Sequence, residues 1–125
     1  MSDLLYKELS YKIIGLAYEV YNTFGSGLRE KIYGDALEEL FKREGIKFSR
    51  ELYQPLKIGE KVISKVYFDF LIDDKIVVEL KSGSDRYKEA CGQIYNYLRA
   101  KDLKLGLIIR FTKDGVKSKR IPNLY

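Results

Sequence analysis

Residues 66–81, Val-Tyr-Phe-Asp-Phe-Leu-Ile-Asp-Asp-Lys-Ile-Val-Val-Glu-Leu-Lys, decide the fold of this chain. β-Branched and aromatic residues fill positions 62–72 and predict a strand, and the strongly apolar run at positions 76–81 predicts a second one. Asp73-Asp74-Lys75 between them predicts a tight turn. A strand as apolar as the second is typical of the centre of a sheet. The segment therefore predicts a β-hairpin whose second strand is buried.

Three charged residues interrupt this apolar hairpin. Side chains alternate along a strand, so Glu79 and Lys81 point to one face, and in a hairpin centred on the turn Asp69 falls opposite Glu79. Burying these charges without partners would be costly. One solution is a structural ion pair between a carboxylate and the lysine. The other is a Mg²⁺ or Mn²⁺ site with carboxylate ligands, where the lysine orients or deprotonates water and offsets phosphate charge.

Outside the hairpin, the pattern predicts a mixed α/β unit with the element order ααβββαββ. The expected helices span residues 4–24, 28–44 and 85–100, and the further strands span residues 47–53, 56–58, 103–111 and 116–121, the last at the sheet edge. Ser2 or Asp3 is expected to cap the first helix and Gly25 to end it, Gly45 ends the second, and Pro55 separates the two short strands. No repeat or linker divides the 125 residues, so one domain over 1–125 is expected.

Composition limits the chemistry. The chain has no histidine, which excludes Ser-His-Asp and Cys-His catalysis and any His-ligated zinc site. Cys91 is the only cysteine, so an internal disulfide is excluded and a cytoplasmic setting fits. No apolar run reaches the length of a membrane span, and the N-terminus lacks the pattern of a signal peptide, so neither is expected.

The net charge of +5 is unevenly distributed. Residues 1–80 hold 12 Lys/Arg and 14 Asp/Glu, giving −2, whereas residues 81–125 hold 11 Lys/Arg and 4 Asp/Glu, giving +7. A basic C-terminal third is expected to attract a polyanion such as nucleic acid. A solvated, lysine-rich surface of the kind common in heat-stable proteins explains the same charge equally well.

Four residues outside the hairpin are further candidates for the site. Glu30 follows Gly25-Ser26-Gly27 at the start of the second helix, where an acidic residue also favours the helix dipole, and Glu19 is a weaker candidate. Gln93 and Tyr97 lie four positions apart on the third helix, so together they face one side and can position a phosphate or water beside Lys81. The 11 tyrosines among lysines suit base stacking, although half-buried packing is the commoner role.

The stretch Gly27-Leu28-Arg29-Glu30-Lys31-Ile32-Tyr33 matches the motif that names the GxxExxY proteins, a group within the PD-(D/E)XK nuclease-like superfamily. The resemblance continues in order through nearly the whole chain. It takes in Ala36-Leu37-Glu38-Glu39-Leu40, Gly45-Ile46, Pro55, Phe68-Asp69, Val78-Glu79-Leu80-Lys81, Gln93-Ile94-Tyr95-Asn96-Tyr97-Leu98 and Leu105-Gly106-Leu107-Ile108-Ile109-Arg110-Phe111. It implies a restriction-endonuclease-like core, in which helices flank a mixed β-sheet that carries an acidic site.

The resemblance also implies roles for the candidates. Asp69 and Glu79 would hold Mg²⁺ or Mn²⁺ with help from Glu30 and a backbone carbonyl next to Glu79, and Lys81 would be the catalytic lysine. Gln93 and Tyr97 look like an accessory Gln-x-x-x-Tyr element. The order of acidic residues is similar to that of archaeal Holliday-junction resolvases, which act as dimers on branched DNA. The cations expected to grip phosphates are Lys101, Lys104, Arg110, Lys117, Lys119 and Arg120.

Two positions depart from the family pattern. Tyr21 stands where many relatives carry histidine, and Arg110 stands where relatives often carry asparagine. The expected function is a divalent-metal-dependent nuclease, acting on DNA more readily than on RNA and forming a homodimer. One alternative is a non-catalytic nuclease-like module that binds nucleic acid or joins a larger complex. Another is a homo-oligomer whose tyrosine-rich surfaces only mediate assembly.

Overall fold

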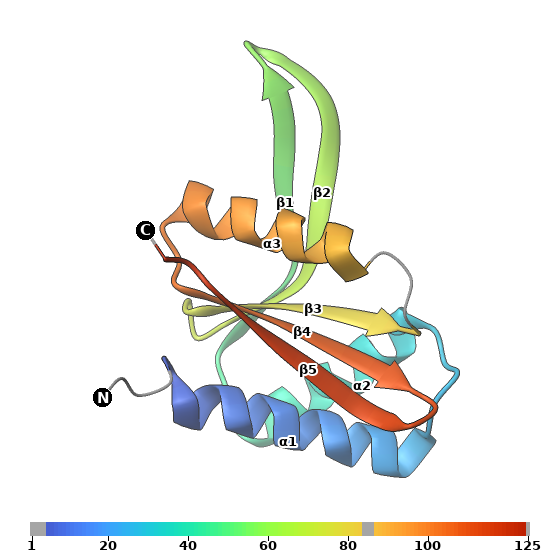
Figure 1. The fold of residues 1–125 in the computed structure, drawn as a ribbon. Coiled ribbons are helices and arrows are strands. Elements are labelled where there is room, and N and C mark those ends of the chain that lie inside the picture. Colours follow the sequence, from blue (N-terminus) through green and yellow to red (C-terminus); the bar gives the residue numbers. More distant parts are fainter. Residues whose placement is uncertain (1–4, 84–86, 125) are drawn as a thin grey trace.

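The computed structural model describes residues 5–83 and 87–124 (Figure 1). The helices are α1 (Lys7–Phe24), α2 (Glu30–Arg43) and α3 (Tyr87–Lys101), and the strands are β1 (Phe48–Ile58), β2 (Lys61–Ile72), β3 (Ile76–Ser82), β4 (Leu105–Thr112) and β5 (Gly115–Pro122). They form one five-stranded mixed sheet, with α1 and α2 on one face and α3 on the other. The α/β class, the order ααβββαββ and the restriction-endonuclease-like architecture predicted from the sequence are therefore confirmed.

The sheet order β1-β2-β3-β4-β5 follows the chain, and β3 lies at its centre as its apolar sequence predicts. β3 and β4 run parallel and are connected through α3, whereas the other neighbouring strands are antiparallel. The hairpin between β2 and β3 turns at Asp73 and Asp74, both with positive φ, which short polar side chains tolerate. The register of this hairpin places Asp69 next to Glu79, because the adjacent residues Phe70 and Val78 are paired.

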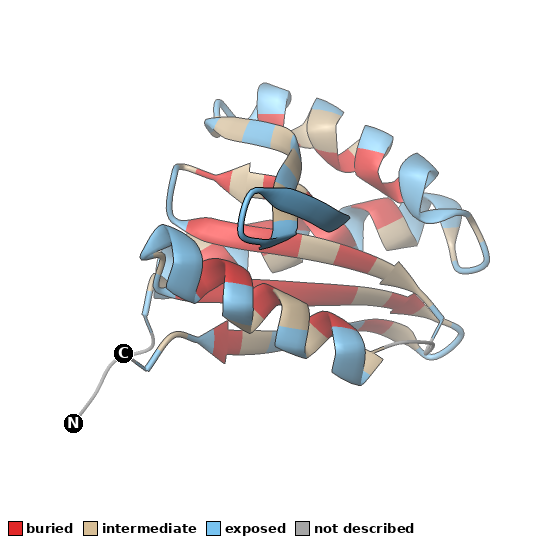
Figure 2. Ribbon diagram, turned by 90° about the horizontal axis from the view of Figure 1, so that it is seen from above, coloured by how far each residue is buried: buried red, intermediate tan, exposed pale blue. Residues whose placement is uncertain are grey.

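Two apolar layers hold the helices to the sheet. Figure 2 shows buried residues concentrated along the strands and on the inward sides of the helices. The layer under α1 and α2 is the larger, and α3 packs against the opposite face around Ile94 and Ile108. Gly106 allows this approach, because a Cβ at that position would overlap the Cγ2 methyl of Ile94. Among the described residues, no helix combines the length and apolar character needed to cross a membrane.

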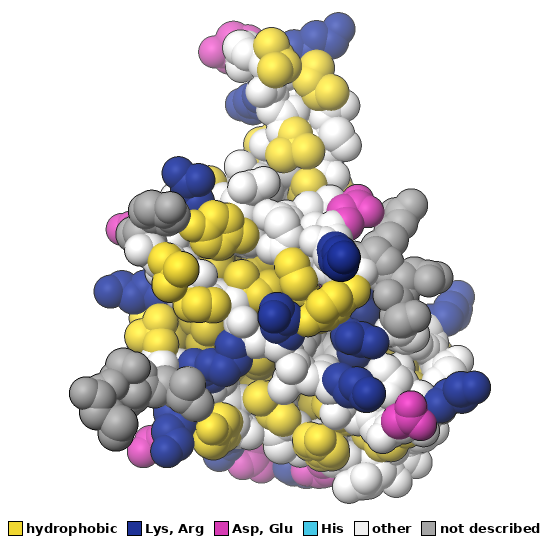
Figure 3. Space-filling view, viewed as in Figure 1, with side chains coloured by type: hydrophobic (Ala, Val, Ile, Leu, Met, Phe, Trp, Pro, Cys, Tyr) yellow, Lys and Arg dark blue, Asp and Glu magenta, His cyan; other side chains and the backbone are white. Residues whose placement is uncertain are grey.

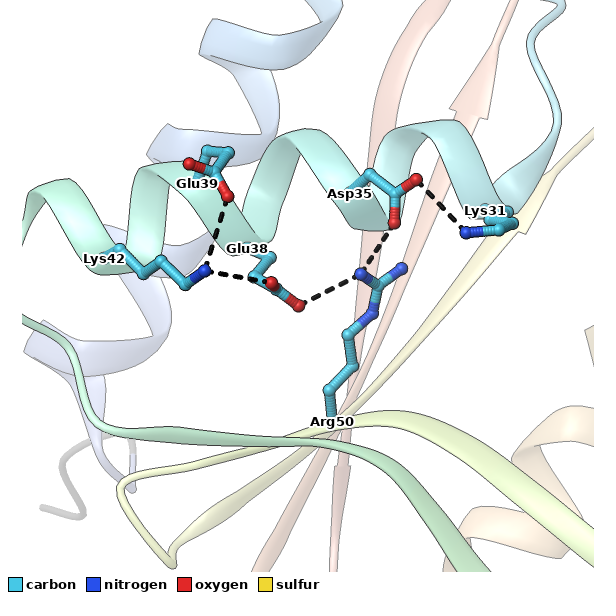
Figure 4. Close-up of polar contacts among 6 residues, drawn as sticks. All are labelled: Lys31, Asp35, Glu38, Glu39, Lys42 and Arg50. Atoms are coloured by element: carbon cyan, nitrogen blue, oxygen red, sulfur yellow. Dashed lines mark hydrogen bonds and ion pairs between the residues drawn. The ribbon is translucent and has the colours of Figure 1, made fainter.

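A polar cluster fixes α2 over β1 (Figure 4). The Arg50 guanidinium donates to Asp35 at 2.7 Å and to Glu38 at 3.1 Å, and it lies over the ring of Phe70. Its hydrogen bonds hold the pKa values of both carboxyls below their ordinary range. A Cβ at Gly34 would lie 2.6 Å from Arg50 Nη2, so glycine makes room for the arginine. The cluster anchors the helix whose first residue is Glu30.

Several element boundaries differ from those expected. β1 is one strand through Pro55, because an edge strand can leave the missing N–H facing solvent. α1 begins at Lys7 after Tyr6, and the expected caps Ser2 and Asp3 lie outside the described residues. α2 begins at Glu30, and the expected start of α3 at Asp85 is likewise outside the described residues.

The ribbon formed by β1 and β2 projects well beyond the rest of the sheet (Figure 1). β2 pairs with β3 only from Phe70 to Ile72, but it pairs with β1 almost to the Lys61 end. From Phe70 toward Lys61 the ribbon therefore separates from β3. Phe68 lies in this separated part and packs on the α3 side of the molecule. This fork in the sheet is where the acidic residues of the hairpin lie.

Candidate active site

Asp69 occupies the fork between β2 and β3. Its Oδ2 accepts a hydrogen bond of 2.7 Å from the backbone N–H of Leu80. Where the two strands separate, this N–H of β3 has lost its strand partner, and the carboxylate replaces it. The hydrogen bond holds the Asp69 side chain against β3, directly beside Glu79.

Glu79 and Lys81 complete the cluster that the sequence pattern places on one face. Glu79 lies beside Asp69 in the hairpin register, and its Oε2 lies 3.7 Å from Lys81 Nζ. Both side chains are largely buried, with 13% of Glu79 and 20% of Lys81 exposed. The structure thus brings the two carboxyls and the ammonium together at the end of the central strand.

The environment of Glu79 disfavours its charged form. Burial, together with the neighbouring carboxylate of Asp69, raises the pKa of Glu79 to about 9, and the charge of Lys81 opposes this rise only in part. Glu79 therefore holds a proton at neutral pH in the metal-free protein. A divalent cation bound at these carboxyls would favour the charged form of Glu79 and so release this proton.

The two carboxyls open into a pocket of about 260 Å³. Its walls are Glu30, Glu51, Tyr67, Phe68, Asp69 and Glu79. Among residues 5–83 and 87–124, no set of three or more acidic or cysteine side chains is close enough to enclose an ion. Mg²⁺ and Mn²⁺ suit this donor set, because such ions commonly bind through one or two carboxylates and complete their coordination with water and phosphate oxygens.

Glu51 is a pocket residue that the sequence reasoning missed. It lies on β1 and reaches the pocket wall with a left-handed backbone, at φ 61°. The register of β1 and β2 places it beside Asp69, since Arg50 pairs with Phe70 and Leu52 with Phe68. That register is set over a ribbon of ten pairs, so no short motif around Glu51 could have indicated its position.

Glu30 reaches the pocket from the first turn of α2. Its Oε2 accepts a hydrogen bond of 3.0 Å from the backbone N–H of Ser82, and the Ser82 hydroxyl donates to the carbonyl of Leu28 at 2.8 Å. These two bonds join the start of α2 to the end of β3. Glu30 therefore lines the same pocket as Asp69 and Glu79, although the three come from different elements.

The rest of the Gly-x-x-Glu-x-x-Tyr stretch holds Glu30 in place. Gly27 has φ 92°, a conformation that glycine adopts readily. The buried Tyr33 hydroxyl donates to the carbonyl of Gly25 at 2.7 Å and accepts from the N–H of Leu28 at 3.2 Å. Its ring stacks on Phe111 with centroids 3.9 Å apart. The stretch therefore acts as a clamp on the connection that leads into α2.

Gln93 and Tyr97 face a different pocket. With Gln54, Leu56, Val66, Phe68 and Asn96 they line a cavity of about 120 Å³ between α3 and the ribbon. Tyr97 is buried against Phe68 with ring centroids 4.7 Å apart, and burial raises its pKa. Gln93 contacts Glu89 at 3.4 Å. In the described part of the chain neither residue bonds to Lys81, and Phe68 stands between their pocket and the acidic one.

The candidate phosphate contacts fall into separate groups. Arg110 pairs in register with Lys81 on one side and with Lys117 on the other, so the three cations form a row across β3, β4 and β5. The Arg110 guanidinium also lies 4.8 Å over the ring of Tyr87. Arg120 instead donates to Ser10 at 2.5 Å and to the carbonyl of Leu5, which ties its side chain to the α1 side.

The other candidates lie away from this row. Lys101 and Lys104 are at the opposite end of the β3–β4 pair from Lys81, and Lys119 is on the exposed edge strand opposite Ile108. Glu19 and Tyr21 lie on α1 and bond to neighbouring elements. Glu19 accepts two hydrogen bonds from Arg43, at 2.6 and 2.8 Å, and Tyr21 donates to the carbonyl of Thr112 at 2.8 Å.

Comparison with known proteins identifies a family and supports the fold. A family model described as the PD-(D/E)XK nuclease superfamily matches residues 7–121. Among solved structures, one titled "Crystal structure of SSO0001" superposes with a TM-score of 0.56 at 24% identity, over 74% of this chain and 48% of that one. The chain spans about half the length of that protein, and the likeness supports the fold alone. No curated protein matches.

Proposed function

This chain belongs to the PD-(D/E)XK nuclease superfamily, and we propose that it is a divalent-metal-dependent nuclease that hydrolyses phosphodiester bonds, in DNA more readily than in RNA. One observation carries the proposal. At the fork between β2 and β3, Asp69 and Glu79 are neighbours in the hairpin register and line one pocket, and Lys81 Nζ lies 3.7 Å from Glu79 Oε2. An ion pair alone does not require the second, repelling carboxyl.

Four residues at the pocket have separate roles in this proposal. Asp69, Glu79 and a backbone carbonyl next to Glu79, that of Val78 or Leu80, would hold Mg²⁺ or Mn²⁺. When bound, such an ion offsets phosphate charge and lowers the pKa of a coordinated water. Lys81 would orient that water or take its proton, and its charge would stabilise the phosphate as it becomes five-coordinate. Glu30 would help to hold the ion from the first turn of α2.

The row of Lys81, Arg110 and Lys117 is the proposed phosphate contact beside the pocket. Its three cations lie on adjacent strands in register, so they present positive charge as a line across the sheet. Lys101, Lys104 and Lys119 would contact phosphates farther along a longer substrate. We propose no phosphate contact for Arg120, because its guanidinium is already bonded to Ser10 and Leu5.

Gln93 and Tyr97 take a supporting role in this proposal. Tyr97 packs on Phe68, and Phe68 also lines the acidic pocket. The pair would therefore act on the site by holding Phe68 and the fork in position. We do not assign either side chain to the attacking water, since both face the neighbouring cavity.

We also propose membership of the GxxExxY group, because all three named residues of its motif help to hold the connection that leads into α2. Gly27 supplies the left-handed backbone, Glu30 bonds to Ser82, and Tyr33 ties the connection together. A single domain over residues 1–125, a homodimer and a cytoplasmic setting stay predictions from the sequence.

The alternative function is a nuclease-like module that binds nucleic acid without cutting it. One observation favours it: within the described residues, no three acidic or cysteine side chains are placed to enclose an ion. An ion held by two carboxylates depends more heavily on water and substrate phosphate for its remaining ligands. Cleavage assays separate the two functions.

The test is a panel of labelled single-stranded, duplex, flap and four-way-junction DNA, and matching RNA, with Mg²⁺ or Mn²⁺. We expect the wild-type chain to cleave at least one substrate and Lys81→Ala to lose at least about 100-fold in rate. Lys12→Ala is the matched control, because Lys12 lies on α1 and pairs only with Glu44 among the described residues. Absence of cleavage, combined with no metal-induced rise in melting temperature, would contradict the proposal.

A further inference from the structure

Two exposed tyrosines stand on the ribbon next to the acidic pocket. Tyr53 on β1 and Tyr67 on β2 are direct cross-strand partners, and their ring centroids are 5.8 Å apart. Tyr53 is 45% exposed and Tyr67 is 58% exposed, so about half of each residue is accessible to a ligand in solution. Tyr67 also lines the acidic pocket, so the two rings extend the pocket wall outward along the ribbon.

The alternation of the ribbon separates this pair from the core. Leu52 and Phe68, the neighbours of Tyr53 and Tyr67, turn toward α3 and belong to its apolar layer. The two tyrosines therefore face the opposite, open side. Among the described residues, neither of their hydroxyls has a hydrogen bond, whereas the hydroxyl of Tyr33 bonds to the backbone. Packing in the core thus explains Tyr33, whereas the exposed pair lies outside both apolar layers.

The ribbon beyond the tyrosines is basic. Residues 54–66 contain Lys57, Lys61 and Lys65 against a single acidic residue, Glu60. Lys65 Nζ lies 5.7 Å from the centre of the Tyr53 ring, so positive charge adjoins the stacking surface directly. Figure 3 shows hydrophobic and basic side chains together along the projecting ribbon. Aromatic faces bordered by lysines are the combination that binds bases and phosphates of one strand at the same time.

We propose that Tyr53 and Tyr67 form a stacking platform for unpaired bases, and that a single strand lying along the ribbon enters the acidic pocket from this side. The substrate class is therefore nucleic acid with a single-stranded segment next to the scissile bond. Duplex does not suit the platform, because its base faces are covered by neighbouring base pairs. The inference rests on the proposed nuclease function for the pocket, but binding to the platform is a separate property.

The test measures binding without cleavage. Fluorescence anisotropy of a short labelled oligothymidine is recorded in EDTA and in Ca²⁺, with a duplex of equal length beside it. We expect Tyr53→Ala and Tyr67→Ala each to weaken oligothymidine binding by about 5- to 100-fold and to leave duplex binding unchanged. Tyr53→Phe and Tyr67→Phe keep the ring and should bind as wild type. Tyr11→Ala, at a 51% exposed tyrosine on α1, is the control for loss of a surface aromatic.

Three results would overturn the platform. The first is wild-type protein that binds no oligothymidine. The second is a set of alanine variants with wild-type melting curves that bind oligothymidine as tightly as wild type. The third is the same unchanged affinity with a molar mass in light scattering that falls by half, which would assign the pair to contact with a second copy of the chain. Loss of affinity on Tyr→Ala in a protein that cleaves nothing would support the platform and contradict the nuclease proposal alone.

Discussion

The Oδ2 atom of Asp69 lies 2.7 Å from the backbone nitrogen of Leu80 and replaces a strand partner where β2 leaves β3. One carboxylate thus completes the backbone hydrogen bonding of the sheet and faces Glu79 in the pocket. The structural task needs only an acceptor oxygen, whereas metal binding needs negative charge. The two tasks can therefore be separated by substitution.

Asp69→Asn and Asp69→Ala should differ in stability but not in activity. Both remove the charge, so both should lose metal binding and cleavage. Only alanine leaves the buried N–H of Leu80 without an acceptor, which costs about 1–3 kcal/mol. Urea unfolding should therefore show Asp69→Ala to be less stable than Asp69→Asn by that amount. Equal stability of the two variants would show that the hydrogen bond from Leu80 to Asp69 does not contribute to stability.

Glu79 should make stability depend on pH. Its pKa is about 9 in the folded protein, against an ordinary value of 4.5. The folded form binds the proton more tightly than the unfolded form, so this contribution is most favourable below pH 4.5 and is lost as pH rises toward 9. Glu79→Gln should remove that decline and melt at a higher temperature than wild type at alkaline pH. Melting curves across this range provide the measurement.

Metal binding should show the opposite dependence, because Glu79 must lose its proton to act as a ligand. Differential scanning fluorimetry should show a larger Mn²⁺-induced rise in melting temperature at about pH 9 than at about pH 6. Glu79→Gln should abolish the rise, and Glu89→Gln, on the exposed surface of α3, should keep it. A rise of the same size at both pH values would exclude Glu79 as a ligand.

Tyr33→Phe should weaken both the fold and the site. It removes the hydroxyl that bridges Gly25 and Leu28 but keeps the ring on Phe111, so we expect a loss of about 1–2 kcal/mol in unfolding experiments. Because the bridge positions Glu30, Mn²⁺ affinity measured by calorimetry should also fall. Tyr21→Phe removes a comparable hydrogen bond to Thr112 and should reduce stability alone. An unchanged Mn²⁺ affinity in Tyr33→Phe would show that the bonds of the Tyr33 hydroxyl do not influence the metal site.

Two glycine substitutions should change stability in opposite directions. Gly106→Ala places a Cβ against Ile94 and should cost about 1–3 kcal/mol, and Ile94→Ala added to it should cost less than the sum of the two single changes. Gly92→Ala, in α3 with nothing within 4 Å of the added Cβ, should stabilise by about 0.5–1 kcal/mol. Urea unfolding of the four variants tests how closely α3 packs on the sheet.

The central hairpin was predictable because its geometry is local. The turn residues, the apolar run and the strand period place Asp69, Glu79 and Lys81 together without knowledge of the other elements. Glu30 was predictable through the motif around it, which also contains the glycine and tyrosine that fix its backbone. The central place of β3 followed from its hydrophobic pattern in the same way.

Features that depend on distant packing could not be predicted. Glu51 reaches the pocket through the register of a long ribbon and an unusual backbone angle. Gln93 and Tyr97 share a helix face, as their spacing indicates, but the twist of the ribbon decides that this face meets Phe68 instead of Lys81. Arg120 has the sequence context of a phosphate contact, and only the position of α1 shows that its side chain is already bonded.

The chain separations across the pocket have a consequence for the order of folding. Asp69 and Leu80 are 11 positions apart, whereas Glu30 and Ser82 are 52 apart. Closing the shorter loop costs less entropy, so the hairpin brings its two carboxyls together before α2 docks. Without a divalent ion, that early step must bury two neighbouring carboxyls, and Glu79 takes up a proton. A divalent ion present during refolding should therefore raise the folding rate, because it would bind the two carboxyls before α2 has docked.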